Sequence, residues 1–390
     1  MSICEYLDKN KNIQDALLTF LENEINTEED FQKLILIINK QKIINDKHEF
    51  TLFLHLLSKI SQNHYRNPDF ISKIKRILKN FEKDIKKNLT NSEIFDIFKG
   101  NKRIILFLFD EKILKIEKNI VQKMIRKKLL KSNYPQYFLP EIKPFISEGW
   151  FTQYSKSEKN EWIKEIEKKI PENFNELRNI GENDNYICKL IQNDSIKDFI
   201  IFVNKNNYSI QSTIESSIYE TNPFLIKKQI NSKSVEDEKV SLIEYAAFYG
   251  AIQIFKYLQL NNALLTPKLW YFVIHGKNGE LIHLLEDNKI KPKKSFKSLL
   301  EESIKCHHND IANYLLDNYF RKSVQNDEFF VNQCFKSYNF AFIQIQFINE
   351  KAFFYICKYN YYTLLNFLLN DKDIDVNQIK IIKFNTIQNY

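Results

Sequence analysis

Two short apolar segments meet at a glycine in Ser241-Leu-Ile-Glu-Tyr-Ala-Ala-Phe-Tyr-Gly250-Ala-Ile-Gln-Ile254-Phe-Lys-Tyr-Leu258. Their apolar residues recur every three or four positions, which is the period of an α-helix. The small residues Ala246 and Ala247 let two helices approach closely. Gly250 can adopt the left-handed conformation that reverses a chain after a helix. The stretch therefore predicts a short helix, a tight turn and a second, antiparallel helix.

Weaker copies of this pattern follow along the C-terminal half. We align them by the first large apolar residue of each predicted second helix, and these anchors lie 27, 30, 29 and 24 residues apart. Regularly repeated helix pairs are typical of stacked repeat proteins, in which each pair buries its apolar face against the next. The anchors are Ile254, Leu281, Ile311, Phe340 and Leu364, and Phe199 begins another second helix upstream.

The N-terminal half carries a degenerate copy of the same pattern. In Glu93-Ile-Phe-Asp-Ile-Phe-Lys-Gly100-Asn-Lys-Arg-Ile104-Ile-Leu-Phe-Leu108 the glycine takes the place of Gly250, and Ile104 takes the place of Ile254. Asn278, Asn309 and Asn360 lie near the turns that correspond to Gly250, and asparagine tolerates the left-handed conformation better than most residues. We therefore predict an all-α, elongated solenoid of helix pairs that continues through both halves of the chain.

The block from about residue 185 to 319 resembles the divergent ankyrin-type domain of a family of uncharacterised ankyrin-repeat proteins that is expanded in some parasitic protists. The resemblance is carried by Tyr219-Glu-Thr-Asn-Pro-Phe-Leu225, Ser241 to Leu258, Leu265-Thr-Pro-Lys-Leu-Trp270, Glu280-Leu-Ile-His-Leu-Leu285 and Glu302-Ser-Ile-Lys-Cys-His-His-Asn-Asp-Ile-Ala-Asn313. Pro171-Glu-Asn-Phe-Asn-Glu-Leu-Arg resembles the helical N-terminal region of the same family. The resemblance implies an intracellular protein-binding scaffold and assigns a role to no individual residue.

We divide the 390 residues into three parts. Residues 1–180 form a helical region of degenerate pairs, residues 181–377 form the ankyrin-like repeats, and residues 378–390 are an incomplete repeat or a frayed tail. If the last helix pair lacks a cap, Leu365 and Leu368 should be partly exposed.

Composition excludes several classes of function. The six glycines form no cluster, although phosphate-binding loops and nucleophile turns require one. The five cysteines are odd in number and include no CxxC pair, as expected of reduced thiols inside a cell. The first residues do not have the pattern of a secretory signal, so we expect none, and no apolar run approaches the roughly 18–20 residues of a membrane span. We expect a cytoplasmic or nuclear protein without enzymatic activity, cofactor, metal or small-molecule substrate.

Histidines and cysteines could still carry chemistry at two places. Cys306-His307-His308 is the densest cluster of metal-ligand types, but a zinc site usually needs two short-spaced pairs, and Cys334 and Cys357 lie in other repeats. We interpret the cluster as turn histidines beside a buried thiol. His275 and His283 flank one turn, where packing and hydrogen bonding explain both.

A basic segment supports an alternative function. Between Lys73 and Lys131 there are 18 basic and 7 acidic residues, with cations on the helix faces that the apolar residues leave free. Such a face could bind nucleic acid or an anionic membrane surface. The cations are mostly lysines, acidic residues are interspersed and no nucleic-acid motif accompanies them, so a solvated face explains the segment better.

The preferred hypothesis is a scaffold or adaptor that binds a protein partner of unknown identity through the concave face and the turns of the solenoid. We expect three turns to form one ridge of the binding surface. The residues of this ridge are Lys277, Asn278, Glu280, His307, His308, Asp310, Ser337, Tyr338 and Asn339.

Overall fold

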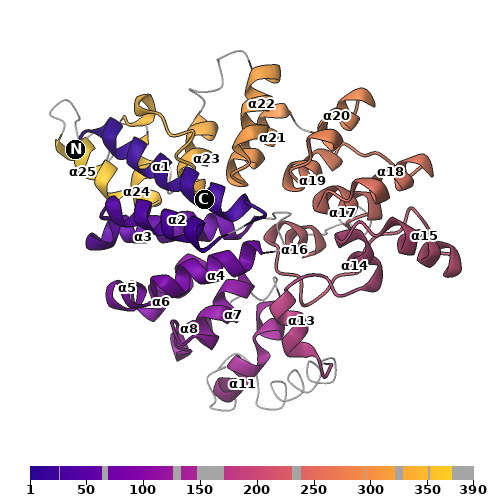
Figure 1. Cartoon of the computed structure of the whole chain (residues 1–390), viewed down its shortest axis with the longest axis horizontal. Coiled ribbons are helices and arrows are strands. Elements are labelled where there is room, and N and C mark those ends of the chain that lie inside the picture. The colour runs from indigo at the N-terminus through magenta and orange to yellow at the C-terminus, as the bar shows by residue number, and fades with distance from the viewer. Residues whose placement is uncertain are drawn as a thin grey trace, which may run out of the picture. The chain divides into compact units, whose positions relative to one another are not determined.

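The computed structural model describes residues 1–25, 27–63, 69–125, 133–146, 171–230, 239–293, 295–320, 328–349 and 352–370 (Figure 1). These ranges contain α-helices, short 3₁₀-helices and one isolated β-bridge between Thr213 and Ser241, and they contain no strand. The predicted all-α class is therefore confirmed for this part of the chain. None of the helices in it combines the length and the apolar character needed to cross a membrane.

The chain divides into two compact units that do not follow the predicted boundaries. Unit 1 consists of Met1–Ile74 together with Val273–Tyr390, and unit 2 consists of Lys75–Phe272. The first 74 residues are thus grouped with the C-terminal helices, and residue 180 lies inside unit 2. The predicted boundary at residue 377 and the predicted tail 378–390 lie outside the described residues.

Unit 2 contains three helix pairs that belong to the predicted pattern or to its degenerate copy. In each pair two short antiparallel helices follow one another closely: α6 with α7, α14 with α15, and α17 with α18. The α14–α15 and α17–α18 pairs also pack side by side, first helix on first helix and second on second. The helices of unit 2 are α5 (Glu82–Asn88), α6 (Asn91–Phe98), α7 (Lys102–Asp110), α8 (Lys118–Met124), α10 (Tyr134–Tyr137), α11 (Leu139–Ile146), α13 (Phe174–Ile180), α14 (Tyr186–Gln192), α15 (Ile196–Lys205), α16 (Pro223–Ile230), α17 (Leu242–Tyr249) and α18 (Ile252–Leu260).

Unit 1 contains helices from the N-terminal and the C-terminal parts of the described chain. Its N-terminal helices are α1 (Ile3–Glu22), α2 (Glu28–Lys40), η1 (Ile43–Asn45) and α3 (Lys47–Ser61). Its C-terminal helices are α20 (Gly279–Asp287), α21 (Phe296–Lys305), α22 (Asn309–Tyr319), α23 (Glu328–Ser337), η3 (Ile345–Phe347), α24 (Phe353–Lys358) and α25 (Tyr362–Asn370). Two helices, α4 (Phe70–Asn80) and α19 (Leu269–His275), cross from one unit to the other. Helix α25 packs on α3, and α1 packs on η3.

The same backbone turn recurs at the end of six first helices. One residue there has a positive φ between 47° and 62°, and its N–H donates to the carbonyl three residues earlier. The N–H of the following residue donates to the carbonyl five residues before it in five of the six turns. This is the Schellman arrangement, which satisfies the last carbonyls of a helix. The residues with positive φ are Asp194, Gly250, Lys277, His307, Tyr338 and Asn360.

Two turn assignments from the sequence are wrong by one or two residues. Asn278 and Asn309 do not adopt the left-handed conformation, which falls instead on Lys277 and His307. Asn278 is the N-cap of α20, where its side chain accepts a hydrogen bond from the N–H of Glu280. Gly100 has no positive φ either, so the turn between α6 and α7 differs from the turn at Gly250. Of the residues that we predicted at these turns, only Gly250 and Asn360 adopt the left-handed conformation.

Five of the six anchors lie in second helices, as predicted. They are buried in α15, α18, α20, α22 and α25. Phe340 is also buried, but it lies in an irregular segment after α23 rather than in a helix. Leu365 is half-buried, as expected of the last pair. The same expectation is wrong for Leu368, because this side chain is only 2% exposed.

Candidate functional site

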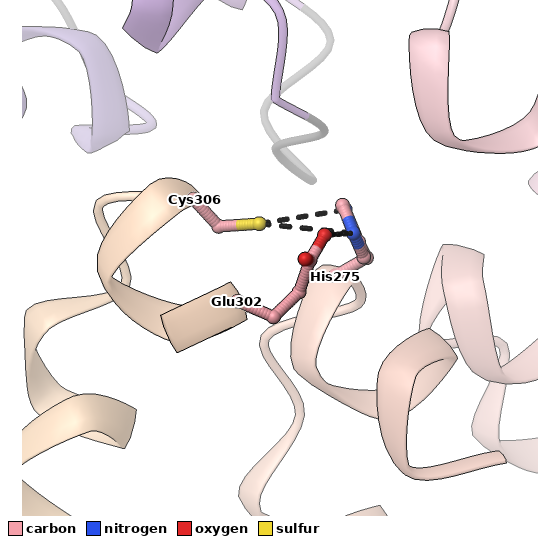
Figure 2. A group of neighbouring side chains, drawn as sticks. All are labelled: His275, Glu302 and Cys306. Atoms are coloured by element: carbon pink, nitrogen blue, oxygen red, sulfur yellow. Dashed lines mark hydrogen bonds and ion pairs between the residues drawn. The ribbon is translucent and has the colours of Figure 1, made fainter. Parts of the chain in front are cut away.

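Three side chains of unit 1 that can ligate metals lie close together at the junction of two helix pairs (Figure 2). His275 is the last residue of α19, Glu302 lies in α21 and Cys306 follows the last residue of α21. Glu302 and Cys306 are four residues apart, so they share one face of the helix. His275 Nε2 lies 2.8 Å from Glu302 Oε1, and Cys306 Sγ lies 3.6 Å from His275 Nδ1 and 3.8 Å from Nε2.

The cluster is almost closed to solvent. The side chains of His275 and Glu302 are 3% and 17% exposed, and Cys306 is fully buried. Burial raises the pKa of the Cys306 thiol. Burial also acts to raise the pKa of Glu302, but the neighbouring Lys305 ammonium and the hydrogen bond from His275 outweigh it and hold this pKa well below its usual range. Lys305 Nζ lies 2.5 Å from Glu302 Oε1. The cluster therefore combines an ionised carboxylate, an imidazole and a neutral thiol.

The three groups are not arranged as a nucleophile with its base. A thiol that gives its proton to histidine must lie along the lone pair of one ring nitrogen. Cys306 Sγ is instead nearly equidistant from both nitrogens, and His275 Nε2 already faces the carboxylate. Sequence reasoning missed this group because its members come from two repeats. The spacing of Glu302 and Cys306 on one helix was the signal that could have found part of it.

His307 and His308 lie at the turn between α21 and α22, beside the buried thiol of Cys306, as the sequence analysis expected. The three side chains diverge, as expected if they do not form one metal site. The thiol faces His275, the Nε2 of His307 donates to the carbonyl of Ser337, and the Nδ1 of His308 donates to the carbonyl of Ile274. Both histidines are buried, and their hydrogen bonds link successive helix pairs. His283 is 64% exposed and pairs with Glu286 on the same helix.

The predicted ridge is not an exposed surface of unit 1. Glu280 and Asp310 are exposed and Lys277 is half-buried, whereas the other six residues are buried. These six are Asn278, His307, His308, Ser337, Tyr338 and Asn339. The expectation that all nine residues contact a separate partner is therefore wrong for the buried members.

The N-terminal helices of the same unit cover this ridge. Gln14 of α1 is fully buried; its side-chain amide donates to Asn339 Oδ1 over 2.8 Å, and its Oε1 accepts from the N–H of Phe340 over 2.6 Å. The Nζ of Lys277 lies 2.8 Å from both carboxylate oxygens of Glu22, and the ring of His55 stacks on Tyr338. The turns thus bind helices of their own chain.

Many lysines of the basic segment already have partners. The Nζ of Lys73 donates to the carbonyls of Phe20, Leu21 and Asn23 at the end of α1. Five others are paired with acidic side chains or buried: Lys79 and Lys86 pair with Glu82, Lys99 and Lys123 pair with Asp96, and Lys102 is 2% exposed. The last cations of the segment, at residues 126–131, lie outside the described residues.

Unit 2 buries a second polar group that the sequence did not indicate. Lys102 and Glu220 are each at most 2% exposed, and the Lys102 ammonium lies 4.8 Å from the centre of the Tyr137 ring. Burial lowers the pKa of Lys102 to about 7 and raises that of Glu220 to about 7, while the opposite charge of each partner acts against these shifts. Glu220 Oε1 accepts from the N–H of Asn222.

Comparison with known proteins adds no relative. No family model matches the chain, and neither a curated protein nor a solved structure matches it.

Proposed function

We propose that this chain is a non-enzymatic scaffold or adaptor that binds a protein partner inside the cell through ankyrin-like helix pairs. The observation that supports the proposal is the turn that recurs after six first helices with nearly the same backbone geometry. When the backbone geometry of the turn is constant, different side chains can occupy equivalent positions beside it. Repeat proteins build extended binding surfaces in this way.

The exposed positions after the turns overlap the predicted ridge only at Glu280 and Asp310. In four pairs the residue three positions after the left-handed turn residue is the second residue of the second helix, and it is exposed. Its identity varies between basic, neutral and acidic side chains, whereas the turn beneath it is constant. The four residues are Lys197 and Gln253 in unit 2 and Glu280 and Asp310 in unit 1. We assign partner recognition to these positions, as one pair of residues in each unit.

Affinity capture from the native cell, followed by a binding assay with the purified partner, tests this assignment. A variant with alanine at all four positions should bind the partner at least about tenfold more weakly, since a few anchors dominate most interfaces. A matched control replaces four exposed charges elsewhere on the same second helices, Lys205, Lys256, Asp287 and Asp317. The control should bind as the wild type does, and both variants should unfold at the wild-type denaturant concentration.

Salt dependence separates this proposal from the basic-segment alternative. Neutralising several phosphates makes affinity fall steeply with added salt, whereas a protein interface weakens far less. Equal loss of binding in both alanine variants, or a partner that is nucleic acid or lipid with a steep salt dependence, contradicts the proposal.

A further inference from the structure

We propose that His275, Glu302 and Cys306 form a binding site for one zinc-type divalent cation, with a fourth coordination position left for water. This inference rests on the geometry of unit 1 and does not depend on the proposed scaffold function. One ligand atom from each side chain lies within 4.8 Å of the other two (Figure 2). A nitrogen, a sulfur and an oxygen donor together suit Zn²⁺, while Mg²⁺ and Ca²⁺ prefer oxygen donors alone.

The two ligand spacings that involve His275 are close to what zinc requires. Bonds of about 2.0–2.3 Å in tetrahedral geometry place neighbouring ligand atoms roughly 3.3–3.7 Å apart. The distance from Cys306 Sγ to His275 Nε2 is 3.8 Å, and the distance from Nε2 to Glu302 Oε1 is 2.8 Å. The histidine and the carboxylate must therefore separate by about half an ångström to admit the ion.

Two further adjustments complete the site. The thiolate must rotate about its Cα–Cβ bond toward Nε2, because Sγ now lies beside both ring nitrogens. The histidine must carry its proton on Nδ1, which leaves the Nε2 lone pair for the metal. Lys305 competes for Glu302, but its side chain is 47% exposed and can turn into solvent.

The position of the site in the fold favours a stabilising role. The histidine ends α19, and the other two ligands lie at the C-terminal end of α21, so the ion would link two successive helix pairs. The proton of the Cys306 thiol is released when the metal binds, so affinity should rise with pH. The carboxylate of Glu302 and the thiolate of Cys306 offset the charge of the cation. Glu302 is the most exposed ligand, so water can reach the fourth position from its side.

Cobalt provides a direct test, because a cobalt–thiolate bond gives a near-ultraviolet charge-transfer band and four-coordinate cobalt has intense visible bands. We titrate the full chain with Co²⁺ in a reducing buffer and then displace the cobalt with Zn²⁺. The wild type should bind one Co²⁺ per chain with both sets of bands. Cys306→Ser should lose the charge-transfer band and bind Co²⁺ at least about tenfold more weakly, because one of the three protein ligands is gone.

Cys334→Ser is the matched control. Cys334 is also fully buried, burial raises the pKa of its thiol in the same way, and it lies beyond the site in α23. The control should keep the full spectrum. His275→Gln and Glu302→Gln supply further variants if Cys306→Ser does not fold, and each should weaken binding. Absence of the bands in the wild type overturns the proposal. So does a charge-transfer band that survives in Cys306→Ser or that disappears in Cys334→Ser.

Discussion

At the residue scale, sequence could locate a turn but not always the residue that bends it. Gly250 is evident because glycine has no side chain to oppose a positive φ. Lys277 and His307 take the same conformation without any sign in their chemistry, and a left-handed residue other than glycine costs about 1–2 kcal/mol. Packing of the neighbouring helix pairs supplies that energy. Local sequence therefore pointed to the nearby asparagines instead.

Substitutions at two glycines test this explanation, and we expect them to have different effects on stability. Gly250 has a φ of 62°, so Gly250→Ala should lower the free energy of unfolding by about 1 kcal/mol or more. Gly279 is the first residue of α20, and apart from its chain neighbours and the adjacent backbone of its own helix, no heavy atom lies within 4 Å of the place that a Cβ would occupy there. Gly279→Ala should therefore be neutral or stabilise by up to about 1 kcal/mol. Urea denaturation of both variants measures the difference. Equal destabilisation would contradict the assigned turn.

His55 should make the protein sensitive to acid. Burial, assisted by the nearby Lys59 charge, lowers its pKa from 6.5 to about 4. Because the folded-state pKa is depressed, the neutral ring is required for full stability, which is present above pH 6.5 and is lost as the pH falls toward 4. The loss attributable to this group is about 2–3 kcal/mol. His55→Phe keeps a ring against Tyr338 but cannot be protonated.

The measurement is the free energy of unfolding at pH 7.5 and at pH 4.5 for both proteins. The variant should lose less stability than the wild type over this interval. His48→Phe is the control, since His48 is exposed while its ring stacks on Tyr362 at 3.9 Å. An identical acid loss in wild type and His55→Phe would show that His55 does not titrate as described.

At the element scale, the sequence was a good guide where a segment is long and strongly periodic. Helices α17 and α18 lie where the pattern from Ser241 to Leu258 predicts them, and Ser241 is the N-cap of α17, with a capping box that includes Glu244. The irregular segment around Phe340 was misjudged, because apolar spacing alone does not distinguish a buried helix from a buried loop. The role of Lys73 was also hidden, since its partners are backbone carbonyls fifty residues away.

Lys73→Met should destabilise unit 1. Its ammonium donates to the carbonyls of Phe20 and Leu21, each over 3.3 Å, and so satisfies the C-terminal end of α1. Removing a charged donor and leaving buried carbonyls without it costs roughly 2–3 kcal/mol. Lys83→Met, at an exposed position of α5, should change stability by less than about 0.5 kcal/mol. Thermal unfolding of the two variants measures both effects. If Lys73→Met lowers the stability as little as Lys83→Met does, Lys73 does not stabilise the end of α1.

At the scale of the whole molecule, the sequence indicated the class of fold but not the grouping of its helices. Each helix pair is encoded locally, so its pattern is visible in one stretch of chain. The packing of α3 on α25 depends on complementary surfaces of two helices that are more than 300 residues apart in the sequence. The periodicity of the apolar residues does not reveal such a contact. For the same reason we expected the predicted ridge to be exposed to a partner. We also overlooked the cluster formed by His275, Glu302 and Cys306. Buried Gln14 of α1 is the clearest example of a contact between the N-terminal helices and the C-terminal turns that the sequence did not reveal.

A double-mutant cycle on Gln14 and Asn339 tests most directly whether the N-terminal helices cover the C-terminal turns. The free energy of unfolding is measured for the wild type, Gln14→Ala, Asn339→Ala and the double variant. Direct hydrogen bonding between the two side chains predicts a coupling energy of about 1–3 kcal/mol. Gln14→Ala combined with Asn318→Ala, whose exposed side chain donates to the carbonyl of Tyr314 in its own helix, should be additive within about 0.5 kcal/mol. Additivity of the Gln14 and Asn339 substitutions within the same limit would show that α1 does not cover these turns.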